Sequence, residues 1–190
     1  FILSVLIFLR NREKSSLYFI GAVFGIALWN AGILFYIQPG VSDLTLLNSK
    51  WNYVWGGLIS YFFMFFALYF GDENRKIPRF KIVIATTVAI TMSIIVFLPG
   101  KYSLIVSNIT EEIVNGLKLK TEVFGSLYSL YIVYILLFFS IGYGVLVGRF
   151  KKSEGIFRTR LIYIFTGSVI ATVFAISTNI FLPFLHLTFI

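Results

Sequence analysis

The chain has 190 residues, of which 58% are hydrophobic and only 13% are charged, and phenylalanine alone occurs 22 times. This composition lies far outside that of soluble domains and indicates an integral membrane protein. With no cysteine and a single histidine, the chain excludes disulfides, Fe–S clusters, thiolate metal sites and cysteine nucleophiles, and we expect no metal or cofactor. The net charge of +8 would suggest nucleic acid in a soluble protein, but the basic residues lie in short loops between apolar segments, so we expect no nucleic-acid partner.

Apolar segments of this chain are long enough to cross a bilayer as helices, since about 20 residues rising about 1.5 Å each span the hydrocarbon core. The segment 1–9 is too short, so we interpret it as part of a first helix whose outer half precedes it, and the apolar residues 187–190 as the start of a seventh helix. The complete spans are expected at about 17–37, 52–70, 82–98, 125–147 and 161–185.

Three of the connections between these spans are strongly basic. They hold 12 of the 16 Lys and Arg residues, and the two other connections hold 4. Basic loops stay in the cytoplasm, so the pattern predicts a multi-pass plasma-membrane protein with its N-terminus outside and the C-terminus of the complete domain inside. The residues that determine this topology are Arg10, Arg12, Lys14, Arg75, Lys76, Arg79, Lys81, Arg149, Lys151, Lys152, Arg158 and Arg160.

Two pairs of glycines have the spacing that lets membrane helices approach closely. They are Gly21 with Gly25 and Gly144 with Gly148. Such pairs serve either packing within one bundle or a dimer face, and we expect the protein to be a homodimer.

The longest connection, 101–124, contains a hairpin signal. Short runs with alternating residues, 113–114 and 117–120, flank Asn115-Gly116, a pair that favours a tight β-turn. We therefore expect a short external β-hairpin. Asn108 opens a glycosylation sequon, whose use would require an outward face.

The predicted fold class follows from these elements. The chain is expected to be an all-α membrane protein, a single polytopic domain over residues 1–190, built as an antiparallel transmembrane helix bundle with about six of seven helices present and the external hairpin added.

Ionisable residues are absent from the predicted spans, although such residues usually mark ion or proton pathways. This argues against a proton-coupled transporter or pump. An intramembrane enzyme would need carboxylates or a histidine pair, so we expect no catalytic residue in this chain.

Uncharged polar and aromatic residues gather in the outer half of several spans. Two interpretations remain open: an interfacial aromatic belt with asparagines bonding between helices, or a pocket for a small apolar or weakly polar ligand. The candidate ligand-binding residues are Trp29, Asn30, Trp55, Tyr128, Tyr131, Thr178 and Asn179.

Several short motifs resemble a known family. They are the segment 27–32 (Ala-Leu-Trp-Asn-Ala-Gly), the aromatic helix entered at Trp51 and Tyr53 and ending Phe66-Ala67-Leu68, and the run Arg158, Arg160, Gly167, Asn179, Leu182-Pro183. Together they resemble the N-terminal seven-transmembrane-helix sensor region of membrane-bound histidine kinases. The resemblance implies a sensory input for a two-component system, with a cytoplasmic kinase module in the same chain.

The predicted function is therefore a membrane sensory domain that detects an external or membrane-borne signal and passes it to that module. The alternative is a transporter or permease for an uncharged solute, for which an inverted internal repeat would be diagnostic.

Overall fold

The computed structural model describes residues 13–36, 38, 40, 42–99, 102–114 and 117–177. The partial first span, the Asn115-Gly116 turn and the outer end of the last span lie outside the described residues. So do Arg10, Arg12, Thr178 and Asn179 among the residues singled out from the sequence.

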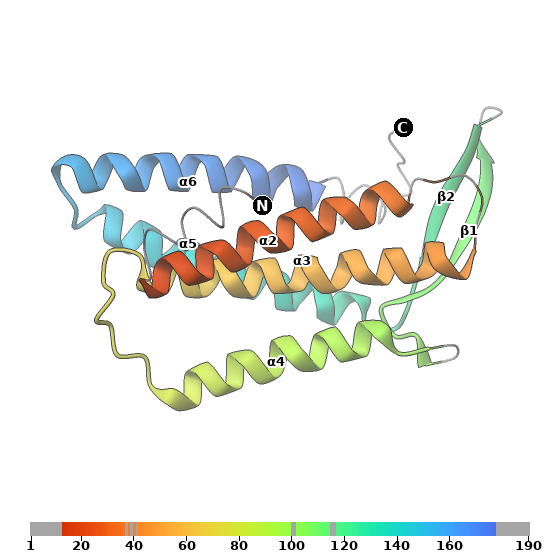
Figure 1. The fold of residues 1–190 in the computed structure, drawn as a ribbon, viewed down its shortest axis with the longest axis horizontal. Helices are drawn as coiled ribbons and strands as arrows, with labels where there is room; N and C mark the ends of the chain where they lie inside the picture. Colours follow the sequence, from red (N-terminus) through yellow and green to blue (C-terminus); the bar gives the residue numbers. More distant parts are fainter. Residues whose placement is uncertain are drawn as a thin grey trace.

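Five helices of the described part are long and apolar enough to cross a membrane, and they alternate in direction (Figure 1). They are α2 (Lys14–Tyr36), α3 (Asp43–Tyr69), α4 (Arg79–Phe97), α5 (Tyr128–Phe150) and α6 (Gly155–Ile176). The strands β1 (Val106–Val114) and β2 (Leu117–Phe124) form one antiparallel pair. The expectation of a mainly helical, multi-pass membrane protein with a short β-hairpin is confirmed, while the count of seven helices stays a prediction.

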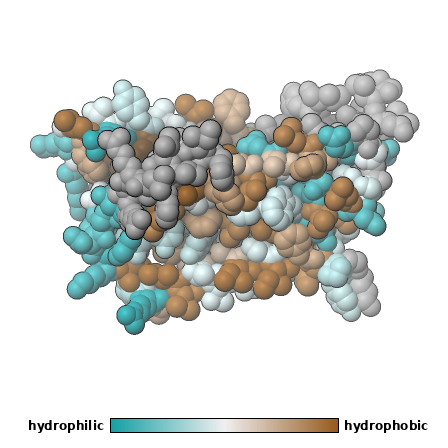
Figure 2. Space-filling model, in the orientation of Figure 1, coloured by the Kyte–Doolittle hydropathy of each residue, from teal (hydrophilic) through white to brown (hydrophobic). Residues whose placement is uncertain are grey.

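The two ends of the bundle differ in chemistry. The β-hairpin and the connection from α2 to α3 lie at one end, which we call the hairpin end. The connections from α3 to α4 and from α5 to α6 lie at the other, which we call the basic end because the topology-determining Lys and Arg residues within the described part are there. Hydrophobic side chains cover much of the surface between the ends, and hydrophilic ones gather toward the basic end (Figure 2).

Helix α3 begins at Asp43, well before the span expected from about residue 52. The cause is a capping box: the Ser42 hydroxyl accepts from the backbone N–H of Thr45, and the Thr45 hydroxyl accepts from the backbone N–H of Ser42. Lys50 therefore lies inside the helix and is only 5% exposed. From the sequence we expect Lys50 in the connection that precedes this span, and the structure places it in the helix instead.

The same helix is the centre of the bundle, because α2, α4 and α5 all pack on it. Phe65 and Ala67 of α3 are fully buried among these neighbours. Helices α4 and α6 bury few of their apolar side chains and leave many exposed, among them Ile84 and Phe174. Because lipid can cover such residues, this exposure fits a membrane helix and would be unusual in a soluble bundle.

The two glycine pairs differ in their surroundings. A methyl group at Gly21 would meet the Phe62 ring at 2.7 Å, and one at Gly25 would meet the Ile59 side chain at 3.0 Å. This pair therefore serves packing of α2 on α3. A methyl group at Gly144 or Gly148 of α5 would meet no atom of another element within 4 Å in the described part of the chain.

Glycine at position 142 permits the contact between α5 and α3. A Cβ atom there would lie 2.8 Å from the Phe63 ring and 3.4 Å from the backbone of Met64. We predict that Gly142→Ala lowers the free energy of unfolding by about 1–3 kcal/mol through overpacking. The matched control is Gly144→Ala on the same helix, where open space lets alanine's higher helix propensity stabilise by up to about 1 kcal/mol. Thermal unfolding in nanodiscs measures both, and equal midpoints would contradict this packing.

Candidate functional site

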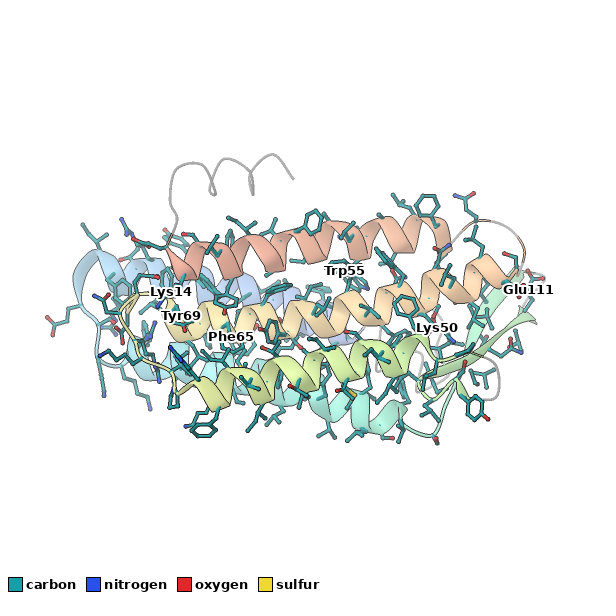
Figure 3. The ribbon with its side chains drawn as sticks, turned by 60° about the horizontal axis from the view of Figure 1, so that its bottom comes forward. Lys14, Lys50, Trp55, Phe65, Tyr69 and Glu111 are labelled. Atoms are coloured by element: carbon teal, nitrogen blue, oxygen red, sulfur yellow. The ribbon has the colours of Figure 1, made fainter. Side chains whose placement is uncertain are left out.

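At the hairpin end, the side chain of Lys50 in α3 lies beside the C-terminal end of α4 (Figure 3). Its ammonium donates to the Leu98 carbonyl at 2.7 Å and to the Ser103 hydroxyl at 2.8 Å, and Ser103 donates to the same carbonyl at 2.8 Å. Helix α4 has no basic residue in its last turn, and its final carbonyls carry partial negative charge. Lys50 thus supplies the cation that this helix end lacks.

Lys120 of β2 does the same for α2. Its ammonium donates to the carbonyls of Tyr36, at 2.7 Å, and Gln38, and it lies 5.5 Å from the centre of the Tyr36 ring. The last turn of α2 also has no basic residue of its own. The hairpin is therefore attached to the end of α2 by a charge-assisted contact.

Glu122, two residues further along β2, points to the same side of the strand and reaches α3. Ser49 donates to one carboxylate oxygen at 2.5 Å, and the Tyr53 hydroxyl donates to the other at 2.6 Å. Part of the Glu122 side chain stays accessible, but its carboxyl group lies within this contact. Burial raises the pKa of that carboxyl above its ordinary value, and the hydrogen bonds from Ser49 and Tyr53 oppose the rise.

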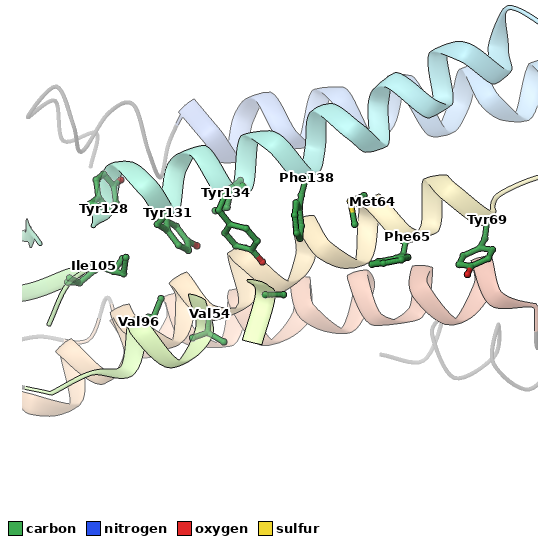
Figure 4. Close-up of a cluster of buried hydrophobic side chains, with 13 residues drawn as sticks. Val54, Met64, Phe65, Tyr69, Val96, Ile105, Tyr128, Tyr131, Tyr134 and Phe138 are labelled. Carbon is green, nitrogen blue, oxygen red and sulfur yellow. The ribbon is translucent and has the colours of Figure 1, made fainter. Parts of the chain in front are cut away.

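A row of tyrosines continues this network along α5 (Figure 4). The Tyr131 hydroxyl donates to the Tyr53 carbonyl at 2.5 Å, and the Tyr134 hydroxyl donates to the Gly57 carbonyl at 2.8 Å. The Tyr128 ring stacks on Phe124 of β2, with the ring centres 3.9 Å apart. Spaced three residues apart, the tyrosines share one face of α5, so the hairpin, α3 and α5 form one connected unit.

Of the ligand-binding residues predicted from the sequence, the structure brings Tyr128 and Tyr131 together, beside Tyr53. The Tyr128 hydroxyl is buried and has no hydrogen-bond partner among the described residues. Within the predicted set, these two tyrosines therefore lie close together, because both of their rings contact the ring of Tyr53.

The other described candidates lie on the α2 side of α3. Trp55 packs edge to face on Trp51 and Phe24, with ring centres 5.6 and 6.0 Å apart. Trp29 is partly exposed. Asn30 is exposed and donates to the Ile26 carbonyl of its own helix at 2.8 Å, so it makes no bond between helices there. A shared ligand pocket for the whole set stays a prediction.

Two hollows in the described part of the chain lie elsewhere, and neither is lined by these candidates. One, of about 530 Å³, is an open apolar groove between α3 and α4, lined by Val54, Leu58, Ile90, Ser93, Ile94, Phe97, Leu98 and Pro99. The other, of about 410 Å³, is at the basic end, lined by Glu13, Ser15, Phe70, Gly71, Glu73, Phe157 and Arg160. No group of three or more His, Cys, Asp or Glu residues able to hold a metal occurs among the described residues.

The whole chain, residues 1–190, matches the family model of the N-terminal 7TM region of histidine kinase. The chain belongs to this family. Comparison with curated proteins and with solved structures gave no match. As a 7TM region of this family, the chain is a membrane sensory domain, a multi-pass and non-catalytic input unit in contact with the lipid bilayer.

The basic end of this 7TM region contains a third contact of the same kind. The Arg149 guanidinium of α5 donates to the Leu68 carbonyl in the last turn of α3 at 2.8 Å. Lys14 lies 5.2 Å from the centre of the Tyr69 ring, and Arg158 lies 4.8 Å from that of Phe150. Several topology-determining residues are thus also packing residues of the sensory domain.

Sequence reasoning missed both the contact of Lys50 with the end of α4 and the network that joins Glu122 to Ser49 and Tyr53. The sequence does contain a signal for Glu122. Lys120 and Glu122 are two residues apart in a strand and must share one face. Nothing local in the sequence indicates that this face meets α3, because the contact joins residues 69 to 73 positions apart.

Removing the Lys50 ammonium tests the capping of α4. We predict that Lys50→Met destabilises the sensory domain by about 1–3 kcal/mol, because buried acceptors lose their donor. The last turn of α4 should also exchange its amide hydrogens faster, as measured by mass spectrometry. Lys152→Met, at an exposed position of the basic end, is the control and should leave both readouts unchanged. Unaltered exchange in the Lys50 variant would refute the capping role.

Proposed function

We propose that this 7TM region detects an external or membrane-borne signal and passes it, through a change in helix packing, to a cytoplasmic histidine kinase module in the same chain. The observation that supports the proposal best is the network joining the hairpin to α3 and α5. A signal acting on the hairpin meets Ser49 and Tyr53 near the start of α3 through Glu122, and α5 through the Tyr53 carbonyl.

Helix α3 is suited to carry such a change to the opposite end. It has 27 residues, so it extends about 40 Å at about 1.5 Å per residue. Its last turn accepts from Arg149 of α5, which lies next to the connection that leads into α6. A shift or rotation of α3 would therefore alter contacts at both ends, provided that two packings of the bundle differ by only a few kcal/mol.

In the proposed orientation the hairpin end faces outward and the basic end faces the cytoplasm, with the N-terminus of the domain outside and the C-terminus of the complete domain inside. The support is the gathering of Lys and Arg in the connections and helix ends of the basic end, as the positive-inside rule requires. A small apolar or weakly polar ligand of the outer half could bind the Tyr128 hydroxyl and the Trp55 indole N–H, two buried groups of the candidate set that have no hydrogen-bond partner among the described residues. Homodimerisation belongs to the same proposal.

Single cysteines can test the orientation, because the chain has none of its own. We predict that Thr110→Cys in β1 reacts with a membrane-impermeant maleimide on intact cells. Asn74→Cys, in the connection from α3 to α4, should react only after lysis. Both residues are exposed, so accessibility within the fold does not differ. Labelling in the reverse pattern would show that the hairpin end faces the cytoplasm and would contradict the proposed orientation.

Tyr131 offers a test of signal transfer. We predict that Tyr131→Phe, which removes the bond to the Tyr53 carbonyl but keeps the ring, changes autophosphorylation of the full-length kinase several-fold; one hydrogen bond of about 1 kcal/mol corresponds to about fivefold. Tyr163→Phe on the outward face of α6, where the side chain is 74% exposed, is the control.

Unchanged autophosphorylation in the Tyr131 variant would remove this contact from the signalling route. Uptake of an uncharged solute by proteoliposomes containing the chain would favour the permease alternative over the sensor.

A further inference from the structure

The Glu122 carboxyl lies at the junction of the hairpin with the helices, and hydroxyl groups rather than cations hold both of its oxygens. Ser49 and Tyr53 are four residues apart on α3, so their hydroxyls point to the same side and receive one carboxyl between them. The paired residue on β1, Ile109, is 3% exposed and covers the same junction. A titratable group is therefore enclosed at the contact that fixes the hairpin.

The charged and titratable groups near this carboxyl come from every element packed around it. They are Tyr36 of α2, Lys50 and Tyr53 of α3, Glu111 of β1, Lys120 of β2, and Tyr128 and Tyr131 of α5.

Neither lysine in this set neutralises Glu122. Lys50 donates to Leu98 and Ser103, and Lys120 donates to the carbonyls at the end of α2. Within the described part of the chain, the negative charge of Glu122 therefore depends on the hydroxyls of Ser49 and Tyr53. A carboxylate held only by neutral donors changes its charge with pH more readily than one in an ion pair.

We propose that Glu122 is a proton-responsive latch, which couples the pH at the hairpin end to the docking of the β-hairpin on α3 and, through the Tyr53 carbonyl, to α5. This inference rests on the proposed function for its biological meaning, since it makes the external proton concentration a signal that the 7TM region reads.

The direction of the response follows from linkage. Burial raises the pKa of Glu122, so the docked hairpin binds a proton more tightly than an undocked hairpin with Glu122 in water. Docking is therefore fully favoured below the ordinary glutamate pKa and weakens as the pH rises through the raised value. The neutral carboxyl can donate to one hydroxyl and accept from the other. The ionised carboxylate loses part of its hydration when the hairpin docks, and this cost weakens docking.

Distance measurement between spin labels on the hairpin and on α3 tests the latch directly. Thr110→Cys and Leu47→Cys provide exposed label sites, 110 on β1 and 47 near the start of α3, in a chain without other cysteines. In nanodiscs, titrated from about pH 4 to about pH 9, the distance distribution should be narrow at low pH and should lengthen or broaden as Glu122 ionises.

Three variants identify the group responsible. Glu122→Gln should abolish the transition and keep the narrow, low-pH distribution at every pH. Tyr53→Phe removes a hydrogen bond that favours the ionised form, so the midpoint should move to higher pH. Glu154→Gln removes an exposed carboxyl at the basic end, far from the hairpin, and should leave the transition unchanged.

A pH-independent distance in the unmodified chain, or a transition that persists in Glu122→Gln, would overturn the latch. A midpoint that stays fixed or falls in Tyr53→Phe would also overturn it, and this variant does not depend on the folding of the glutamine form. Because the measurement needs no kinase module, a flat response refutes the latch even where the 7TM region regulates a kinase. A pH-dependent distance that Glu122→Gln abolishes supports the latch even where the 7TM region does not regulate a kinase.

Discussion

The bundle depends on cations that one element supplies to the helix ends of another. Helices α2, α3 and α4 each lack a basic residue in the last turn, and each receives one from elsewhere: Lys120 from β2, Arg149 from α5 and Lys50 from α3. The last carbonyls of a helix have no partner within the helix, and near or inside a membrane they have little water to replace it. A cap from another element satisfies these carbonyls and also fixes which helix end lies beside which element.

The contacts of β2 explain why a two-stranded hairpin can be part of a membrane domain. An isolated hairpin of this size is marginally stable in water. Here β2 is anchored at neighbouring positions of one face, by Lys120 to the end of α2 and by Glu122 to α3, and Phe124 stacks on Tyr128 of α5. The hairpin thus contacts helices from different parts of the chain. A change in its position would therefore alter contacts with α2, α3 and α5.

Periodicity and loop charge predict the helices well, because the bilayer imposes a length and an apolar surface that the sequence must display locally. The hairpin was predictable for a similar reason, since Asn115-Gly116 with alternating flanks is a local signal. The start of α3 does not follow from hydropathy, because the charged Lys50 precedes the apolar segment, and the local signal for the true start is the Ser42 capping box.

The site was less predictable, because it depends on which faces meet. Depth alone placed Asn30 and Trp55 with Tyr131, but Asn30 is turned away from the bundle and Trp55 faces α2. In the sequence, Glu122 lies in a connection between two predicted spans. The helix that it would reach cannot be inferred from residues more than 60 positions away.

The polar bonds of α3 have a consequence for signalling. Apolar contacts along α3 are non-directional and tolerate small rotations, whereas hydrogen bonds require defined positions. Such bonds occur at the hairpin end, through Lys50 and Tyr53, and further along the helix at the Gly57 carbonyl, the Tyr61 hydroxyl and the Leu68 carbonyl. A rotation of α3 therefore changes the free energy mainly where these bonds break or form. In the proposed orientation the bonds of the hairpin end are the ones nearest the exterior, so an external signal would act on them while the resulting movement is expressed along the whole helix.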